Sequence, residues 1–129
     1  MNSLIYKKDS KKDLYDIRDA LESRLKSSQF SILTEIDVAK VMEKKGIDFD
    51  KEFLLLGICN PNFAKEALTL NSDVSVSLPC SITIEKTTTG STVKLARPTF
   101  MVNYYKNEEL DDLGQKAEDI LIEAIDEVI

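Results

Sequence analysis

Two cysteines are the residues of this sequence best suited to chemistry, and one of them stands where a strand should give way to a helix. Cys59 ends the apolar run FLLLGIC and is followed by Asn60 and Pro61, a good N-cap and a good first helical residue. A helix N-terminus favours thiolate over thiol, and thiolate is the reactive form of cysteine. Cys59 is therefore a candidate nucleophile, although a small apolar packing residue would fit the same corner.

The same corner is a candidate ligand site. Backbone donors at a helix start can bind an anion, and open sheets flanked by helices bind ligands at the carboxyl ends of strands. We therefore expect Cys59, Asn60 and Pro61 to contact a small ligand, either anionic or sulfur-containing. If the strand that opens at Cys80 lies beside the strand that ends at Cys59, both sulfurs reach one pocket. Cys80 and Glu35 complete the candidate ligand-binding set, and buried packing is the alternative for Cys80.

The residue types that are missing exclude several chemistries. The sequence has no histidine, which excludes Ser-His-Asp and Cys-His catalysis and zinc sites that need imidazole. Its four glycines are isolated, so no Gly-rich phosphate loop is present. Two cysteines could hold a soft metal only with help from carboxylates or a second subunit. Glu35 and Asp37 could act as paired carboxylates, but Asp37 is better explained as a helix cap. We expect no metal and no cofactor, and we assign no reaction.

Composition indicates one ordinary globular domain spanning residues 1–129. At 43% apolar residues, the chain can bury a core without disulfide or metal. Its net charge of −6 argues against a nucleic-acid partner. No apolar run approaches the ~20 residues that span a bilayer, so no membrane partner is expected. Two cysteines are too few for a secreted disulfide scaffold, which favours a cytoplasmic location.

The acidity is concentrated near the end of the chain. Residues 108–129 hold nine acidic residues and one basic residue, a net charge of −8. The residues fall on the polar positions of a helical pattern, which indicates a solvated helix face or an acidic docking face.

Hydrophobic periodicity predicts nine elements. Apolar residues at helical spacing indicate helices, and alternating or continuous apolar runs bounded by turn residues indicate strands. The predicted strands are 4–8, 30–36, 53–59, 80–86 and 91–97, and the predicted helices are 11–28, 38–45, 61–70 and 108–129. The pattern predicts an α+β fold with about five strands, in the order β-α-β-α-β-α-β-β-α. Strands 80–86 and 91–97 should form an antiparallel hairpin around TTTG.

Capping residues define the helix ends. Asp9 or Ser10 can cap the first helix, and Asp37 can cap the second, which Gly46 can close in a left-handed conformation. Val38 and Val41, with Met42, should point inward from that second helix.

Apolar faces suggest a subunit contact. The residues of strand 53–59 are apolar at both alternating sets of positions, as expected of a strand covered on both faces or by a dimer partner. Strand 30–36 places Ile32 and Ile36 on one covered face. The final helix has so broad an apolar stripe that it needs cover on more than one side. Arg97, at a strand end, should reach solvent rather than bind an anion.

Four short motifs carry a resemblance to a known family. They are T-E-I-D at residues 34–37, G-x-C-N-P at 57–61, A-x-x-A-L at 64–68 and L-P-C at 78–80. With these motifs the chain resembles the family named domain of unknown function 302, from about residue 13 to the C terminus. Gln29 stands where that family usually has a glycine, and Ser75 and Ser77 interrupt a run that is usually apolar. The resemblance implies a two-layer α/β fold with a mixed sheet of about five strands and helices packed on it, and a homodimer; it implies no reaction.

Three hypotheses for function follow. The first is a small homodimeric module that binds a small ligand at the Cys59-Asn60-Pro61 corner. The second is a cysteine-dependent redox protein or sulfur carrier, with Cys59 as nucleophile and Cys80 as resolving thiol. The third is a structural or interaction protein that dimerises through its terminal helix.

Overall fold

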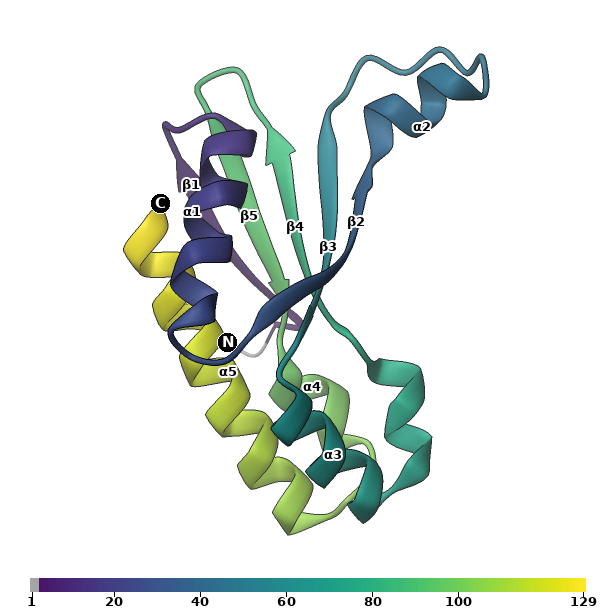
Figure 1. Cartoon of the computed structure of the whole chain (residues 1–129), viewed down its shortest axis with the longest axis vertical. Helices are drawn as coiled ribbons and strands as arrows, with labels where there is room; N and C mark the ends of the chain where they lie inside the picture. Colours follow the sequence, from purple (N-terminus) through teal and green to yellow (C-terminus); the bar gives the residue numbers. More distant parts are fainter. Residues whose placement is uncertain (1–2) are drawn as a thin grey trace.

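The computed structural model describes residues 3–129, which form one five-stranded sheet and its helices (Figure 1). The strands are β1 (Ile5–Ser10), β2 (Ser31–Asp37), β3 (Phe53–Cys59), β4 (Cys80–Lys86) and β5 (Ser91–Ala96). They lie in the order β1-β5-β4-β3-β2. The predicted α+β class, strand number and β4–β5 hairpin are confirmed.

Every neighbouring pair of strands is antiparallel, so the predicted mixed sheet is wrong. The reason is the path of the connections (Figure 1). The segment between β2 and β3 turns back beyond one end of the sheet, and the segment between β3 and β4 turns back beyond the other end. Neither connection crosses a face of the sheet, as a parallel neighbour would require.

The helices are α1 (Leu14–Lys26), α2 (Val38–Lys44), α3 (Pro61–Leu70), the 3₁₀ helix η1 (Ser72–Ser77), α4 (Pro98–Asn103) and α5 (Glu108–Val128). The short α4 was not predicted, and it begins where Pro98 suits a first helical position. The cap of α1 is Asp13, whose Oδ2 accepts a hydrogen bond from Tyr15 N at 3.0 Å; Asp9 and Ser10 still belong to β1. Within residues 3–129, no helix combines the length and apolarity needed to cross a bilayer.

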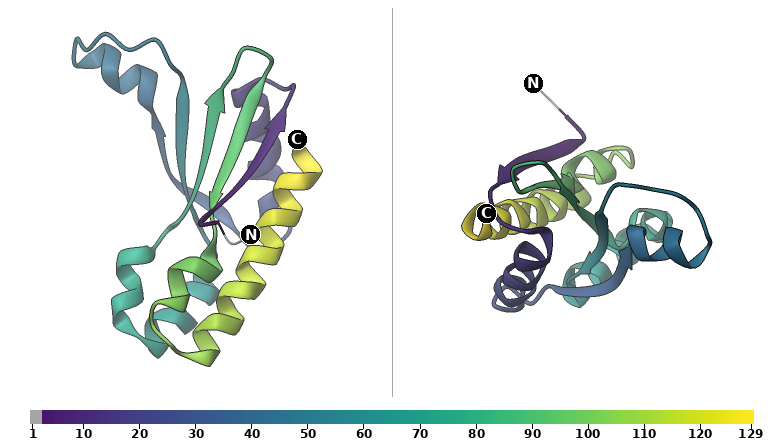
Figure 2. Two further views of the ribbon diagram at one scale, coloured as in Figure 1. Left: turned by 180° about the vertical axis from the view of Figure 1, so that it is seen from behind. Right: turned by 90° about the horizontal axis from the view of Figure 1, so that it is seen from above.

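One face of the sheet, here called the inner face, packs against α1 and α5 (Figure 2). Alternate strand residues supply it, and α1 adds a stripe of leucine and isoleucine. Its fully buried side chains include Leu54, Leu56, Ile58, Ile82, Ile84, Leu95, Ile17, Leu21 and Leu25. The apolar stripe of α5 is covered by the sheet, α1, α3 and α4 of its own chain. The subunit contact expected at this helix is therefore not needed to cover it.

A β-bulge in β2 changes which side chains reach the inner face. The register with β3 shifts between Ile32 and Thr34, so Leu33 is the extra residue. Beyond the bulge, Glu35 lies opposite buried Leu56, whereas Ile36 lies opposite Leu55 on the other, outer face. The prediction that Ile32 and Ile36 share a covered face is therefore wrong, and Ile36 is 47% exposed.

Residues 33–52 form an arm: residues 34–37 still pair with β3, and residues 38–52 project beyond the end of the sheet (Figure 1). Helix α2 lies on this arm and has no buried residue, so the prediction that Val38, Val41 and Met42 point into a core is wrong. Its ends are as predicted: Asp37 Oδ1 accepts from Lys40 N at 3.3 Å, and Gly46 has φ of 69°. Large apolar side chains remain exposed on the arm: Leu33, Ile36, Val41, Ile47 and Phe49.

Candidate functional site

A cavity of about 100 Å³ lies at the end of the sheet where β3 stops and β4 begins. Its walls come from the strand ends and from α3, η1, α4 and α5. Residues that line it include Phe30, Cys59, Asn60, Phe63, Ala67, Leu78, Pro79, Cys80, Met101 and Gly114. Both cysteines line this one cavity, Cys59 from the end of β3 and Cys80 from the start of β4, where Cys80 pairs with Ile58. Pro61 begins α3 just outside the lining residues.

The corner after Cys59 is built by Asn60. Its Oδ1 accepts hydrogen bonds from Asn62 N at 3.0 Å and Phe63 N at 3.3 Å, and its backbone carbonyl accepts from Ala64 N at 2.9 Å. Pro61 has no N–H to offer. The predicted cap is confirmed, and it occupies the backbone donors that an anion would need.

Both thiols are held in the neutral form. Burial raises the pKa of Cys59 above its ordinary value. Burial, followed by repulsion from Cys59 once that thiol is ionised, raises the pKa of Cys80 to about 11. Near neutral pH the cavity therefore presents two thiols rather than a thiolate, which weighs against Cys59 as a nucleophile.

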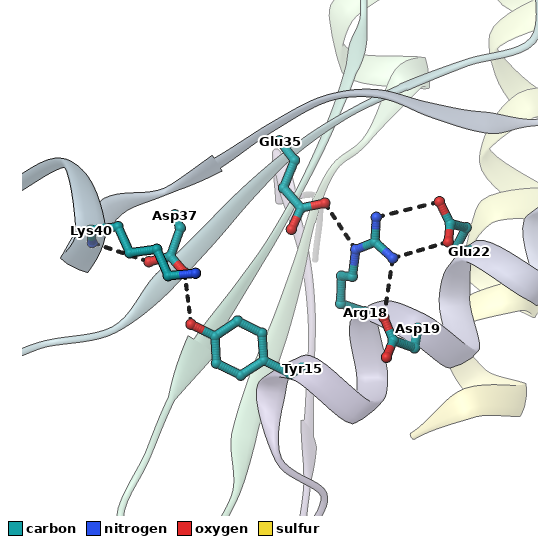
Figure 3. A network of polar contacts seen from close by, with 7 residues as sticks. All are labelled: Tyr15, Arg18, Asp19, Glu22, Glu35, Asp37 and Lys40. Carbon is teal, nitrogen blue, oxygen red and sulfur yellow. Dashed lines mark hydrogen bonds and ion pairs between the residues drawn. The ribbon is translucent and has the colours of Figure 1, made fainter.

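Glu35 does not join the cysteines. It lies beside α1, where its Oε1 accepts a hydrogen bond from Arg18 Nε at 2.9 Å (Figure 3). The Arg18 guanidinium also contacts Asp19 at 3.1 Å and Glu22 at 3.0 Å. This network ties α1 to β2, which is a sufficient structural role for Glu35.

Asp37 has partners different from those of Glu35. Tyr15 donates its hydroxyl hydrogen to Asp37 Oδ2 at 2.7 Å (Figure 3). This hydrogen bond, with some burial, raises the pKa of Tyr15 to about 12. Because Glu35 pairs with Arg18 while Asp37 caps α2 and binds Tyr15, the two carboxylates do not form a catalytic pair.

Sequence reasoning missed a buried carboxylate next to the cavity. Glu118 of α5 is 3% exposed, and its Oε2 accepts from Arg97 Nη2 at 3.1 Å and Nε at 3.2 Å. Its Oε1 accepts from Thr99 N at 3.1 Å and Thr99 Oγ1 at 2.7 Å. The prediction was that Arg97 reaches solvent. In the structure its guanidinium instead donates to the buried carboxylate of Glu118. The prediction that the acidic residues of 108–129 fall on polar positions is therefore wrong for Glu118, which lies inside the apolar stripe of α5, between Ala117 and Leu121; that position was the signal in the sequence.

This carboxylate positions one wall of the cavity. Helix α4 has no cap from its own N-cap residue, and Glu118 supplies the missing acceptor to Thr99 N. From α4, Pro98, Met101 and Val102 line the cavity. Glu118 is thus a positioning residue for that wall.

The described residues hold no ready-made metal site and no orphaned polar group. Among residues 3–129, no three His, Cys, Asp or Glu side chains gather as a metal would require. In the same part of the chain, every buried side-chain nitrogen and oxygen has a hydrogen-bond partner.

Comparison with known proteins supports the resemblance drawn from the four motifs. Residues 6–128 match the family described as domain of unknown function DUF302. No curated protein gives a significant match. Among solved structures, the chain is similar to the crystal structure of an uncharacterized conserved protein DUF302 from Bacillus stearothermophilus, with a TM-score of 0.93 and 24% identity. The match covers 99% of this chain and 100% of that one, and at this identity it supports the fold alone.

Proposed function

We propose that this chain, which belongs to the family named domain of unknown function DUF302, is a homodimeric module that binds a small molecule beside Cys59 and Cys80. The observation that carries the proposal is the cavity of about 100 Å³ that both cysteines line. Well-formed apolar pockets with a few polar groups are the usual sites for small ligands. Cys59, Asn60 and Cys80 are its proposed ligand-contacting residues.

Binding explains the site better than thiol chemistry. A nucleophilic cysteine needs a thiolate or a neighbouring base. Burial raises the pKa of both thiols, and the chain contains no histidine to act as base. The cysteines therefore serve as wall residues of the cavity in this proposal.

The proposed dimer uses the outer face of the sheet and the arm. The outer face carries Phe53 and Leu55, which are only half-buried within the chain, next to the exposed Ile36. Phe49 of the arm stacks against Phe53 with ring centroids 6.2 Å apart, so the apolar surface is continuous between arm and sheet. Helix α2 is short and has no core of its own, so we expect this apolar surface to be covered.

Charge favours a second copy of this chain at the outer face. The C-terminal segment, residues 108–129, has a net charge of −8, and α5 lies on the inner face. Two copies that meet through their outer faces keep these acidic helices apart, because each sheet stands between them. Any pairing through α5 would bring like charges together. A two-fold dimer through the arm therefore combines apolar burial with the least repulsion.

A methyl-resolved NMR titration tests the binding function. The chain has three methionines, of which Met101 lines the cavity and Met42 lies on α2. With ¹³C-methyl methionine, a set of fragments below about the size of indole is screened against the protein. We expect at least one fragment to shift the Met101 methyl saturably and leave Met42 unchanged. Failure of every fragment, whether charged or neutral, to move Met101 would contradict the binding function.

A further inference from the structure

The structure assigns a ligand class to this cavity: we infer that its occupant is a small, uncharged, apolar molecule no larger than about one aromatic ring. The inference rests on the binding function proposed above and replaces the anionic ligand that the sequence suggested. Three properties of the cavity carry it: the charge of its walls, the state of the helix start beside it, and its size and lining.

The described residues that line the cavity include no acidic or basic side chain. A charged ligand would therefore lose its hydration and meet no counter-charge, which is costly in an apolar site. Among the polar side chains, Asn60 is used as a cap, and Ser77 Oγ lies 3.5 Å from the hydroxyl of Tyr105. Ser81, the remaining serine of the lining, is exposed, so little hydrogen-bonding capacity points into the interior.

The helix start beside the cavity cannot replace a counter-charge. In the first turn of α3, Pro61 lacks an N–H, and the N–H groups of Asn62, Phe63 and Ala64 all donate to Asn60. Asn60 itself is 6% exposed and donates its side-chain N–H to Ser28 O at 3.4 Å. An anion would have to displace this cap, and the local helix with it, to find donors.

Size and lining point to a ring or a short aliphatic chain. An engineered apolar cavity of about 150 Å³ binds benzene or xenon, and this cavity is of similar order, at about 100 Å³. Phe30 and Phe63 meet edge to face with centroids 5.8 Å apart and present aromatic surface to it. The sulfurs of Cys59, Cys80 and Met101 are polarizable and favour contact with an aromatic ring.

The discriminating experiment compares benzene with benzoate, which share a ring and differ in charge. Each is titrated into the full chain at pH 7 while the methyl signals of Met101 and Met42 are followed. We expect benzene to shift Met101 saturably, with an affinity at least tenfold higher than that of benzoate, and to leave Met42 unchanged.

Two variants of α3 provide the control. Ala67→Leu adds side-chain volume to the cavity wall, whereas Lys65→Leu adds the same side chain at an exposed position of the same helix. We expect Ala67→Leu to weaken benzene binding at least tenfold and Lys65→Leu to leave it unchanged. If Ala67→Leu fails to fold, Met101→Leu, read by benzene-induced protection against thermal unfolding, takes its place and should change affinity relative to Lys65→Leu.

The outcomes separate the ligand class from the binding function. Binding of benzoate as tightly as benzene, or more tightly, would overturn the uncharged class while leaving a small-molecule site in place. Binding of neither probe, with no fragment moving Met101, would overturn both. Benzene binding that Ala67→Leu and Met101→Leu leave unchanged would show that the ring sits elsewhere and would also overturn the inference.

Discussion

Pro79 lies so close to Gly57 that a Cβ added to the glycine would come within 2.7 Å of Pro79 Cγ. The same Cβ would overlap the side chain of Thr34. Gly57 thus allows three motif segments, on β2, β3 and the start of β4, to approach one another next to the cavity.

Gly57→Ala should destabilise the protein by about 1–3 kcal/mol, because Thr34 and Pro79 must move to admit the methyl group. Chemical denaturation measures the loss. Gly46→Asn is the matched control, since Gly46 has no neighbour within 4 Å of an added Cβ and asparagine tolerates its positive φ. Equal stability of Gly57→Ala and the wild type would contradict the close packing described here.

Glu118→Gln should destabilise the protein by about 1–3 kcal/mol, because an amide offers one acceptor oxygen where Arg97 and Thr99 direct four donors. The loss should also loosen α4, and with it the cavity wall at Met101. Urea unfolding gives the free energy, and the Met101 methyl signal reports the wall. The exposed Glu66→Gln should change stability by less than about 0.5 kcal/mol and leave Met101 unmoved.

Stability should fall at alkaline pH through Cys80. Its folded-state pKa is about 11, above its ordinary value of 9.0, so the folded protein holds the proton more tightly than the unfolded chain. The resulting stabilisation is fully present below pH 9 and is lost as the pH rises from 9 to about 11. Urea unfolding of the wild type and Cys80→Ala across this range isolates the contribution of Cys80. Tyr6 and Tyr15, whose pKa values are also raised, contribute equally in both proteins. A pH dependence identical in the two proteins would contradict a buried, neutral Cys80.

Replacing an exposed apolar residue of the arm by lysine should weaken the proposed dimer. Ile36→Lys puts a charge at the centre of the outer apolar surface, and we expect the dissociation constant of the dimer to rise at least tenfold. Light scattering after size exclusion, over a concentration series, measures it. Val76→Lys is the control, because Val76 is 84% exposed on η1, away from the arm. A wild-type protein that stays monomeric at high concentration would contradict the dimer itself.

Features governed by neighbours in sequence were predictable. Asn60 and Asp37 act as caps because a side-chain oxygen reaches N–H groups two or three residues ahead, and Gly46 closes α2 through its own φ. The alternation of residues 80–86 and 91–97 was enough to predict their hairpin. Gln29 stands where the family usually has a glycine. It has a φ of 64°, a positive value that a glycine would adopt without strain.

Features that depend on distant segments were not predictable from one sequence. The bulge at Leu33 follows from the pairing of β2 with β3, and it reverses the faces of Glu35 and Ile36. The bond between Arg97 and Glu118 joins residues 21 positions apart on different elements. The prediction of a ligand site at this corner rests on an analogy with parallel sheets, whereas this sheet is antiparallel. The corner lines a cavity because α3 and η1 fold back over the end of the sheet.

The cavity is walled largely by helices at the end of the sheet, and among the described strands only the ends of β3, β4 and β5 take part. A ligand can therefore enter without breaking the hydrogen bonds between the strands and without disrupting the core on the inner face. We expect any opening that admits a ligand to be local to α3, η1 or α4 and to appear as faster amide hydrogen exchange in these segments than in the central strands. Substitutions confined to these segments should accordingly change which ligands the cavity admits while leaving the pairing of the sheet unchanged.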